Sequence, residues 1–279
     1  MDPRDFLATL AVTLPMLALA SAIELGLPMF RRPAGQRGRV ATNLALTGVT
    51  LAWNGLLTWT AAGIALALSV EGRGLMTWIE VPFPVQVVVG FVVLDFSFGY
   101  FAHRAMHASP LLWRAHRVHH SDPFVDATTT FRNHPIEGLW RFLCILVPTW
   151  ILGLPAEAVA LQRLLTVING VLEHSNIRVW PPLDRALGWF WVTPAMHKVH
   201  HSRDRIETDS NYGNILSIYD RVLRTFTSTE RAGSVTYGLD DVDPTEAQAL
   251  PRLLAMPFRP PGSSSDPRAR SGPASDALA

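Results

Sequence analysis

Four apolar stretches dominate the first two thirds of the chain, and short polar or basic pieces separate them. They cover residues 6–30, 41–70, 84–102 and 139–171. About 20 consecutive apolar residues are enough for a helix to cross a hydrocarbon core of roughly 30 Å. The first three stretches therefore predict membrane-spanning helices. The chain as a whole is predicted to be an all-α integral membrane helical bundle.

The fourth stretch contains a break at Gly153-Leu154-Pro155. Proline lacks an amide hydrogen and glycine has a freer backbone, so this break favours a turn between two helices. At 1.5 Å per residue the two arms, of about 14 and 17 residues, would reach only about 21 to 25 Å. The stretch is predicted to be a helical hairpin that either crosses the membrane or dips into it, and that returns to the side where it began.

The first apolar stretch has two interpretations. Ala18-Leu19-Ala20 resembles the cleavage site of a secretory signal peptide. The segment before the stretch, residues 1–5, is net acidic, whereas signal peptides begin with a basic region. A retained membrane helix is therefore favoured over a cleaved signal peptide.

Basic residues are unevenly distributed among the loops that join the apolar stretches. Arg31, Arg32, Arg37 and Arg39 lie between the first two stretches, whereas only Arg73 lies between the second and third. Loops rich in arginine and lysine usually remain in the cytoplasm. The loop between the first two stretches is therefore predicted to be cytoplasmic. The third helix would end on the same side, so the residues after 102 are predicted to be cytoplasmic as well. Further arginines follow there, at Arg104, Arg114, Arg117, Arg132 and Arg141.

Composition supports a membrane protein and excludes several other classes. The 279 residues are 48% hydrophobic and only 17% charged, which excludes a disordered chain. A formal net charge of +1 provides no broad basic surface, so nucleic acid is not an expected partner. The single cysteine, Cys144, excludes a disulfide framework and CxxC metal or redox sites.

Histidine is the residue that points to chemistry. Eight of the ten histidines fall in residues 103–120 and 197–201. They form HxxxH, HxxHH and HxxHH motifs, and residues three or four apart share one face of a helix. Imidazole suits iron, copper, nickel and zinc, and eight ligands exceed the four of a tetrahedral zinc site. Two metal ions are therefore implied. Ordinary core or solvated histidines are the alternative, which three such motifs on one predicted membrane face disfavour. The motif residues are His103, His107, His116, His119, His120, His197, His200 and His201.

Three residues outside the motifs are further candidates. His174 follows the returning arm of the hairpin, which would bring it beside the motifs as a ligand. His134 is also a candidate ligand, but it lies in a loop before Pro135 that fixes no ligand direction. Asp95, eight residues before His103, would face roughly the same side of the third helix. It could accept a hydrogen bond from a ligand imidazole or make a structural hydrogen bond within the bundle.

The histidine pattern resembles the fatty acid hydroxylase and sterol desaturase superfamily, which consists of non-haem di-iron membrane enzymes. The resemblance covers roughly residues 85–226. It extends beyond the three motifs to Asp95, to His134-Pro-Ile-Glu137, to His174-Ser-Asn, to Asn211-Tyr-Gly-Asn214 and to Tyr219-Asp-Arg221.

The resemblance implies an oxidoreductase of lipid biosynthesis, which uses dioxygen to hydroxylate or desaturate a fatty acid, a sterol or a related lipid. Its cofactors would be two iron ions, for which zinc is a substitute during overexpression because it binds more tightly. The implied metal ligands are His103, His107, His116, His119, His120, His174, His197, His200 and His201, and His134 is a further candidate.

The chain departs from the pattern in two ways. Some members have a histidine where Gly170 lies here. Other members carry a fused cytochrome domain that this sequence does not contain, so an external electron donor of the reductase, ferredoxin or cytochrome type is expected. The alternative functions are a metal transporter and a non-catalytic lipid-binding relative. A transporter would place its ligands near the bilayer midplane, whereas these histidines lie beyond the predicted helix ends.

The expected organisation has three parts. Residues 1–84 would form N-terminal transmembrane helices, and residues 85–226 the di-iron catalytic domain with a histidine-rich cap on the cytoplasmic side. Residues 227–279 would be a polar C-terminal segment, disordered from about residue 257, where Pro, Gly, Ser and Asp dominate. Five tryptophans surround the predicted interface, where anchoring in the membrane and core packing are equal interpretations. They are Trp113, Trp140, Trp180, Trp189 and Trp191.

Overall fold

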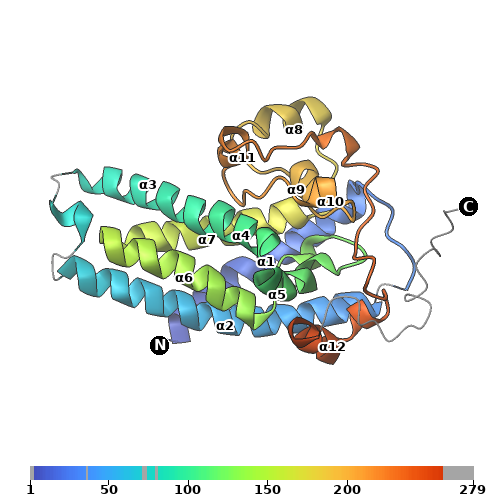
Figure 1. Ribbon diagram of the computed structural model, residues 1–279, viewed down its shortest axis with the longest axis horizontal. Helices are drawn as coiled ribbons and strands as arrows, with labels where there is room; N and C mark the ends of the chain where they lie inside the picture. The colour runs from blue at the N-terminus through green and yellow to red at the C-terminus, as the bar shows by residue number, and fades with distance from the viewer. Residues whose placement is uncertain (1–2, 36, 71–73, 79–80, 260–279) are drawn as a thin grey trace, which may run out of the picture.

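The computed structural model describes residues 3–35, 37–70, 74–78 and 81–259, and these residues form an all-α fold (Figure 1). Within them, regular β structure is limited to two isolated bridges, Pro28 with Ile177 and Trp191 with Leu216. The predicted fold class is therefore confirmed.

Long helices lie alongside one another and form the bundle. They are α1 (Pro3–Gly26), α2 (Arg37–Val70), α3 (Phe83–Leu94), α6 (Pro135–Leu152) and α7 (Ala156–His174). Among the described residues, three helical segments are long and apolar enough to cross a membrane, namely Arg37–Leu57, Phe83–Ala108 and Pro135–Leu152, and Leu10–Gly26 is a shorter apolar segment. Large apolar side chains such as Val88 and Trp150 are exposed on these helices, as expected for surfaces that face lipid.

The third predicted helix ends later than its sequence pattern suggested. It runs from α3 through a π-helical segment, η2 (Asp95–Phe101), into α4 (Ala102–Ala108), instead of ending at residue 102. The chain has no glycine or proline between Phe101 and Ala108, and Ser109-Pro110 then ends the helix and begins the next. His103 and His107 therefore lie on the last two turns of one continuous helix.

The predicted hairpin is present as α6 and α7. Its turn contains Gly153, whose φ of 65° lies in the left-handed region that glycine adopts without strain. The hairpin packs against α3 and η2 through a core that includes Leu94, Phe98, Ile145 and Val159. This packing places the start of α6 beside α4, where the Trp140 side chain donates to the Ala102 carbonyl.

Short helices gather at the end of the bundle where α4 ends (Figure 1). Three of the short α-helices begin with a side chain that caps the first backbone amides: Ser109 for α5 (Pro110–His120), Thr193 for α9 (Pro194–His200) and Asp204 for α10 (Arg205–Thr208). The remaining short elements are η1 (Leu75–Trp78), η3 (Ala127–Thr129), α8 (Pro181–Leu187), α11 (Ile218–Val222), η4 (Thr229–Arg231), η5 (Glu246–Gln248), α12 (Leu250–Ala255) and η6 (Met256–Phe258).

The segment after residue 226 packs onto this end of the molecule. Leu253 and Met256 join a core cluster with Leu46 and Val118. The Arg132 guanidinium donates a hydrogen bond of 2.6 Å to the Ala247 carbonyl. Pro257, near the predicted start of disorder, is buried, and residues 260–279, on which the rest of that prediction falls, lie outside the described residues.

Truncation after Arg259 is expected to leave thermal stability unchanged, because residues 260–279 contain no apolar face to bury. Truncation after Phe226 would instead expose Leu46 and Val118, and should cause severe destabilisation. Thermal unfolding of both truncated chains in detergent checks this difference. A large loss of stability in the longer chain would show that residues 260–279 cover part of the structure.

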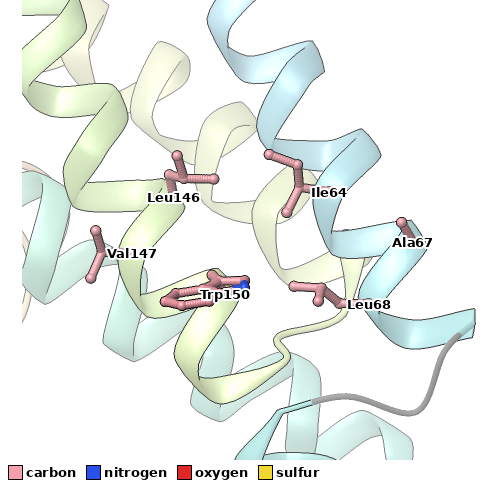
Figure 2. Close-up of a pocket in the computed structure, with 6 residues that line it drawn as sticks. All are labelled: Ile64, Ala67, Leu68, Leu146, Val147 and Trp150. Atoms are coloured by element: carbon pink, nitrogen blue, oxygen red, sulfur yellow. The ribbon is translucent and has the colours of Figure 1, made fainter.

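An apolar cavity of about 420 Å³ lies between α2 and α6 (Figure 2). Ile64 and Leu68 of α2 face Leu146 and Trp150 of α6 across it. None of its lining side chains is an acid, a base or a metal ligand. The chemistry of the molecule must therefore be sought elsewhere.

Candidate metal centre

Nine buried histidines converge where α4, α5, α7 and α9 meet. They form two groups, and within each group the candidate ligand atoms all lie within 4.8 Å of one another. The five-histidine group consists of His103, His107, His116, His120 and His200, and the four-histidine group consists of His119, His174, His197 and His201.

Each pair of adjacent histidines is divided between the groups. His119 belongs to the four-histidine group and His120 to the five-histidine group, and His201 and His200 are divided in the same way. Successive helical residues point about 100° apart, so two neighbours can reach two different centres. The HxxHH motifs therefore place the two groups side by side.

Backbone carbonyls fix the tautomer of three histidines. The Nδ1 atoms of His103, His174 and His200 lie 2.8, 2.7 and 2.7 Å from the carbonyl oxygens of Tyr212, Gly170 and Ser210. A carbonyl oxygen can only accept a hydrogen bond, so each Nδ1 must carry the proton. The Nε2 atom of each ring is therefore left with a lone pair that faces the other histidines.

These lone pairs face one another at short distance. Nε2 of His103 lies 3.0 Å from Nε2 of His116, whose Nδ1 donates to a carboxylate. Nε2 of His174 lies 2.9 Å from Nε2 of His197. The Nε2 atoms of His107 and His200 are buried with no hydrogen-bond partner among the described residues. Neutral nitrogens arranged in this way repel unless a cation lies between them, so the donor set fits bound metal ions.

Burial keeps these rings neutral. It lowers the pKa of His200 to about 4, and it lowers the pKa of His116, His119, His120, His197 and His201 well below the usual histidine range. Metal binding requires the neutral ring, whose lone pair is free. At neutral pH no proton therefore competes for these sites.

Two carboxylates orient imidazoles from behind, and a third lies near them; sequence analysis did not assign these roles. Glu137 accepts a hydrogen bond of 3.1 Å from Nδ1 of His116, and Asp209 accepts one of 3.1 Å from Nδ1 of His107. Such acceptors fix ring orientation and make the opposite nitrogen a better metal ligand. Glu173 lies 3.8 and 3.9 Å from the Nδ1 atoms of His174 and His197, which is beyond hydrogen-bond distance. Glu137 lies three residues after His134, and Glu173 directly precedes His174. This closeness to candidate ligands was the signal in the sequence that could have identified both carboxylates.

Replacing Glu137 with glutamine is expected to weaken metal binding or turnover by about 10 to 100-fold, the usual cost of removing such a partner. The carboxylate accepts from both His116 and Arg141, and a neutral amide satisfies both donors poorly. Competition with a chelator measures the change in metal affinity. Glu157→Gln, an exposed position at the start of α7, is the matched control, and equal losses in both variants would contradict an orienting role.

Two predicted site residues lie outside both groups. His134 caps α6: its Nδ1 accepts a 3.2 Å hydrogen bond from the Ile136 amide, and its Nε2 lies 3.2 Å from the Leu254 carbonyl. Asp95 accepts a 3.1 Å hydrogen bond from the Leu216 amide, and no hydrogen bond joins it to an imidazole in the described part of the chain. The π-helical segment between Asp95 and His103 turns by less per residue than an α-helix, which explains why the expected shared face is lost.

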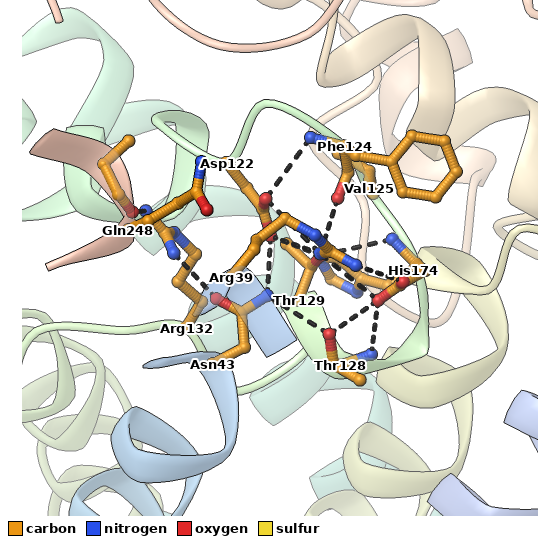
Figure 3. A network of polar contacts seen from close by, with 12 residues as sticks. Arg39, Asn43, Asp122, Phe124, Val125, Thr128, Thr129, Arg132, His174 and Gln248 are labelled. Atoms are coloured by element: carbon orange, nitrogen blue, oxygen red, sulfur yellow. Dashed lines mark hydrogen bonds and ion pairs between the residues drawn. The ribbon is translucent and has the colours of Figure 1, made fainter. Parts of the chain in front are cut away.

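A buried ionic network supports the four-histidine group (Figure 3). Arg39 of α2 binds Asp122 at 3.2 Å, and also binds Asp126 and the Phe124 carbonyl. Lys198 donates to the Val125 carbonyl at 2.9 Å and to the His174 carbonyl at 2.5 Å. The network thus connects α2, the loop after α5, the end of α7 and α9.

Comparison with known proteins supports one family. The sequence pattern that defines the fatty acid hydroxylase family matches residues 87–225, which contain all nine clustered histidines. The chain is 34% identical over 178 residues to an ornithine lipid hydroxylase of Rhizobium tropici, a match that covers 63% of this chain and 51% of the relative. It is 30% identical over 152 residues to the alkylglycerol monooxygenase of Homo sapiens, covering 53% and 32% of the two chains.

A third similar protein is a very-long-chain aldehyde decarbonylase of Oryza sativa, 30% identical over 143 residues that cover 50% of this chain and 54% of the relative. The chain thus spans about half or less of the length of these relatives. No solved structure gives a significant match. The family pattern and the histidine motifs coincide on the same residues. The chain therefore belongs to the fatty acid hydroxylase superfamily.

Proposed function

We propose that this protein is a membrane-bound, non-haem di-iron oxidoreductase that uses dioxygen to hydroxylate or desaturate a lipid. The observation that carries the proposal is the convergence of nine buried imidazoles in groups of five and four. Their Nε2 lone pairs point inward, and partners on their Nδ1 side hold several of the rings in place.

The donor set favours two redox-active ions. A structural zinc site has four ligands in a closed tetrahedral shell, and the group of five exceeds that number. Imidazole also suits iron, and on six-coordinate ions groups of five and four would leave positions for small molecules. Side-chain acids and bases cannot oxidise an unactivated carbon–hydrogen bond. Bound iron would supply the activation of dioxygen that this oxidation needs, with electrons from an external carrier.

The chain's own residues provide geometry and a dry environment. His103, His174 and His200 keep their protons on Nδ1, which leaves each Nε2 free for a metal. Glu137 and Asp209 hold the rings of His116 and His107. All nine rings are buried, which excludes bulk water from the reacting atoms.

A lipid substrate fits the position of the site. The histidines lie at one end of helices whose outer faces are apolar, so an acyl or sterol body can remain in the bilayer while one carbon reaches the metals. The similar proteins are named as a lipid hydroxylase and an alkylglycerol monooxygenase, which supports hydroxylation of a lipid.

Elemental analysis and product analysis test this function together. Protein purified from iron-supplied cells should hold about two iron ions per chain, because nine imidazoles nearly fill two octahedral shells. With a reductase system and labelled dioxygen, lipid extract should acquire labelled hydroxyl groups or new double bonds, detected by mass spectrometry. Iron-loaded, reducible protein that modified no fatty acid, sterol, carotenoid or sphingolipid would contradict the proposal.

We also propose that the histidine end faces the cytoplasm, because Arg31, Arg32 and Arg37 are exposed at that end of the molecule. An Ile206→Cys variant in a Cys144→Ser background carries one thiol at an exposed site near the histidines. An impermeant thiol reagent applied to intact cells should leave this thiol unlabelled, and should label it after lysis. Labelling in intact cells would reverse the orientation.

A further inference from the structure

An unusual surface flanks the histidine end: six large apolar side chains that are 46 to 70% exposed. They come from α8, from the residues beside it and from α11. We call this surface the aromatic rim, and it consists of Trp180, Leu183, Leu187, Trp189, Phe190 and Val222. Single exposed apolar residues are common in proteins, but a contiguous set of this size indicates a contact with something apolar.

Contacts between α8 and α11 make the rim one surface. The Ser217 amide donates to the Phe190 carbonyl at 3.2 Å, and the Arg221 guanidinium donates to the Gly188 carbonyl at 2.7 Å. The same guanidinium lies 4.1 Å from the centre of the Trp189 ring. Figure 1 shows α8 and α11 together, off the axis of the long helices.

The rim is continuous with a predicted membrane span. The Tyr219 hydroxyl of α11 donates to the Val92 carbonyl of α3 at 3.1 Å, and the Tyr219 ring packs edge-on against Phe96 at 5.4 Å. Val88, Val92 and Phe96 are themselves exposed on that helix. The apolar surface therefore extends from α3, which is expected to face lipid, onto the short helices beside it.

Charge on the rim has one sign. Arg178, Arg185 and Arg224 are exposed in the segments that carry it. The only acidic residues in 177–192 and 215–226 are Asp184 and Asp220, and both are buried. Arginines beside exposed tryptophan and leucine match the border between anionic lipid headgroups and acyl chains.

We infer that the aromatic rim is an in-plane membrane contact, which inserts its apolar side chains into the headgroup region of an anionic leaflet while its arginines bind lipid phosphates. The inference is independent of the proposed reaction, since it requires only that α3 spans the bilayer. It also separates the tryptophans into two roles. Trp180 and Trp189 are exposed for anchoring, whereas Trp140 and Trp191 donate inward, to the Ala102 carbonyl and the Asn169 side chain.

Fluorescence quenching in lipid nanodiscs tests the contact. In a Cys144→Ser background, an environment-sensitive dye is attached to Phe190→Cys on the rim, or to Ile206→Cys, an apolar position of α10 that is 82% exposed and lies outside the rim. Nitroxide-bearing phospholipids should quench the dye at residue 190 several-fold more than at residue 206. Aqueous iodide should show the reverse preference. Equal quenching by iodide at both positions would overturn the inference.

A charge-reduced variant tests the lipid preference. Arg185→Gln combined with Arg224→Gln should weaken the lipid quenching at residue 190 in discs rich in anionic phospholipid, and the difference should disappear in purely zwitterionic discs. Thermal unfolding of each variant verifies that the fold is retained. If the dye at residue 190 is shielded in native membranes but not in nanodiscs of the purified protein, the rim binds a protein partner and the membrane assignment is wrong.

Discussion

Alanine substitution at His120 or His201 is expected to reduce lipid oxidation by about a thousandfold or more, because the two histidine groups would act as one unit. His120 belongs to the five-histidine group and His201 to the four-histidine group. Their rings stack with centroids 4.6 Å apart. Removal of either imidazole would therefore leave a space between the two groups. Turnover assays with ferrous iron, reductase and labelled dioxygen measure the loss.

Two further measurements make this prediction specific. The double variant should be no worse than either single variant, since loss of one centre already stops the reaction. His134→Ala serves as the control, because His134 caps α6 outside both groups, and its loss should cost only about 1 kcal/mol of stability without loss of metal. Multiplicative losses in the double variant would show two independent centres.

Replacement of Arg39 with methionine is expected to lower the free energy of unfolding by about 3–5 kcal/mol, the usual cost of leaving buried charges without a partner. The guanidinium and the carboxylates of Asp122 and Asp126 have fully buried side chains, so water cannot compensate for its loss. A fall of about 6 to 20 °C in Tm should result, at about 2 to 4 °C per kcal/mol for a chain of this size. Thermal unfolding in detergent measures it.

Arg37 is the matched control for this prediction. It is an arginine at the start of the same helix, two residues earlier, but it is exposed. Arg37→Met should change stability by no more than about 0.5 kcal/mol. If both variants unfolded at the same temperature, the network in Figure 3 would contribute no net stability.

Local sequence pattern was sufficient to predict the main helices and eight of the nine clustered histidines. Apolar runs indicate spans, Gly153 with Pro155 indicates the hairpin turn, and three- or four-residue spacing gathers imidazoles on one face. All of these signals act between residues close in the chain. The approach of His174 to the other histidines depended on the return of the hairpin, which topology made predictable.

Contacts between residues far apart in the chain could not be predicted from local sequence pattern. Asp209 reaches His107 across 102 residues, and Leu254 reaches His134 across 120 residues. No spacing rule connects such distant positions. The π-helical segment was hidden for a related reason: it contacts α6, where Arg141 donates to the Phe98 carbonyl from 43 residues away.

The division of each His-His pair between the two groups has a consequence for assembly. Because α5 and α9 each serve both centres, the first cation to bind would fix helices that the second also needs. The loss of conformational entropy would then fall mainly on the first binding step, and the second ion would bind more tightly than the first. Metal uptake would be positively cooperative, so partly loaded chains would be scarce at equilibrium and a population at half stoichiometry would consist of full and empty molecules.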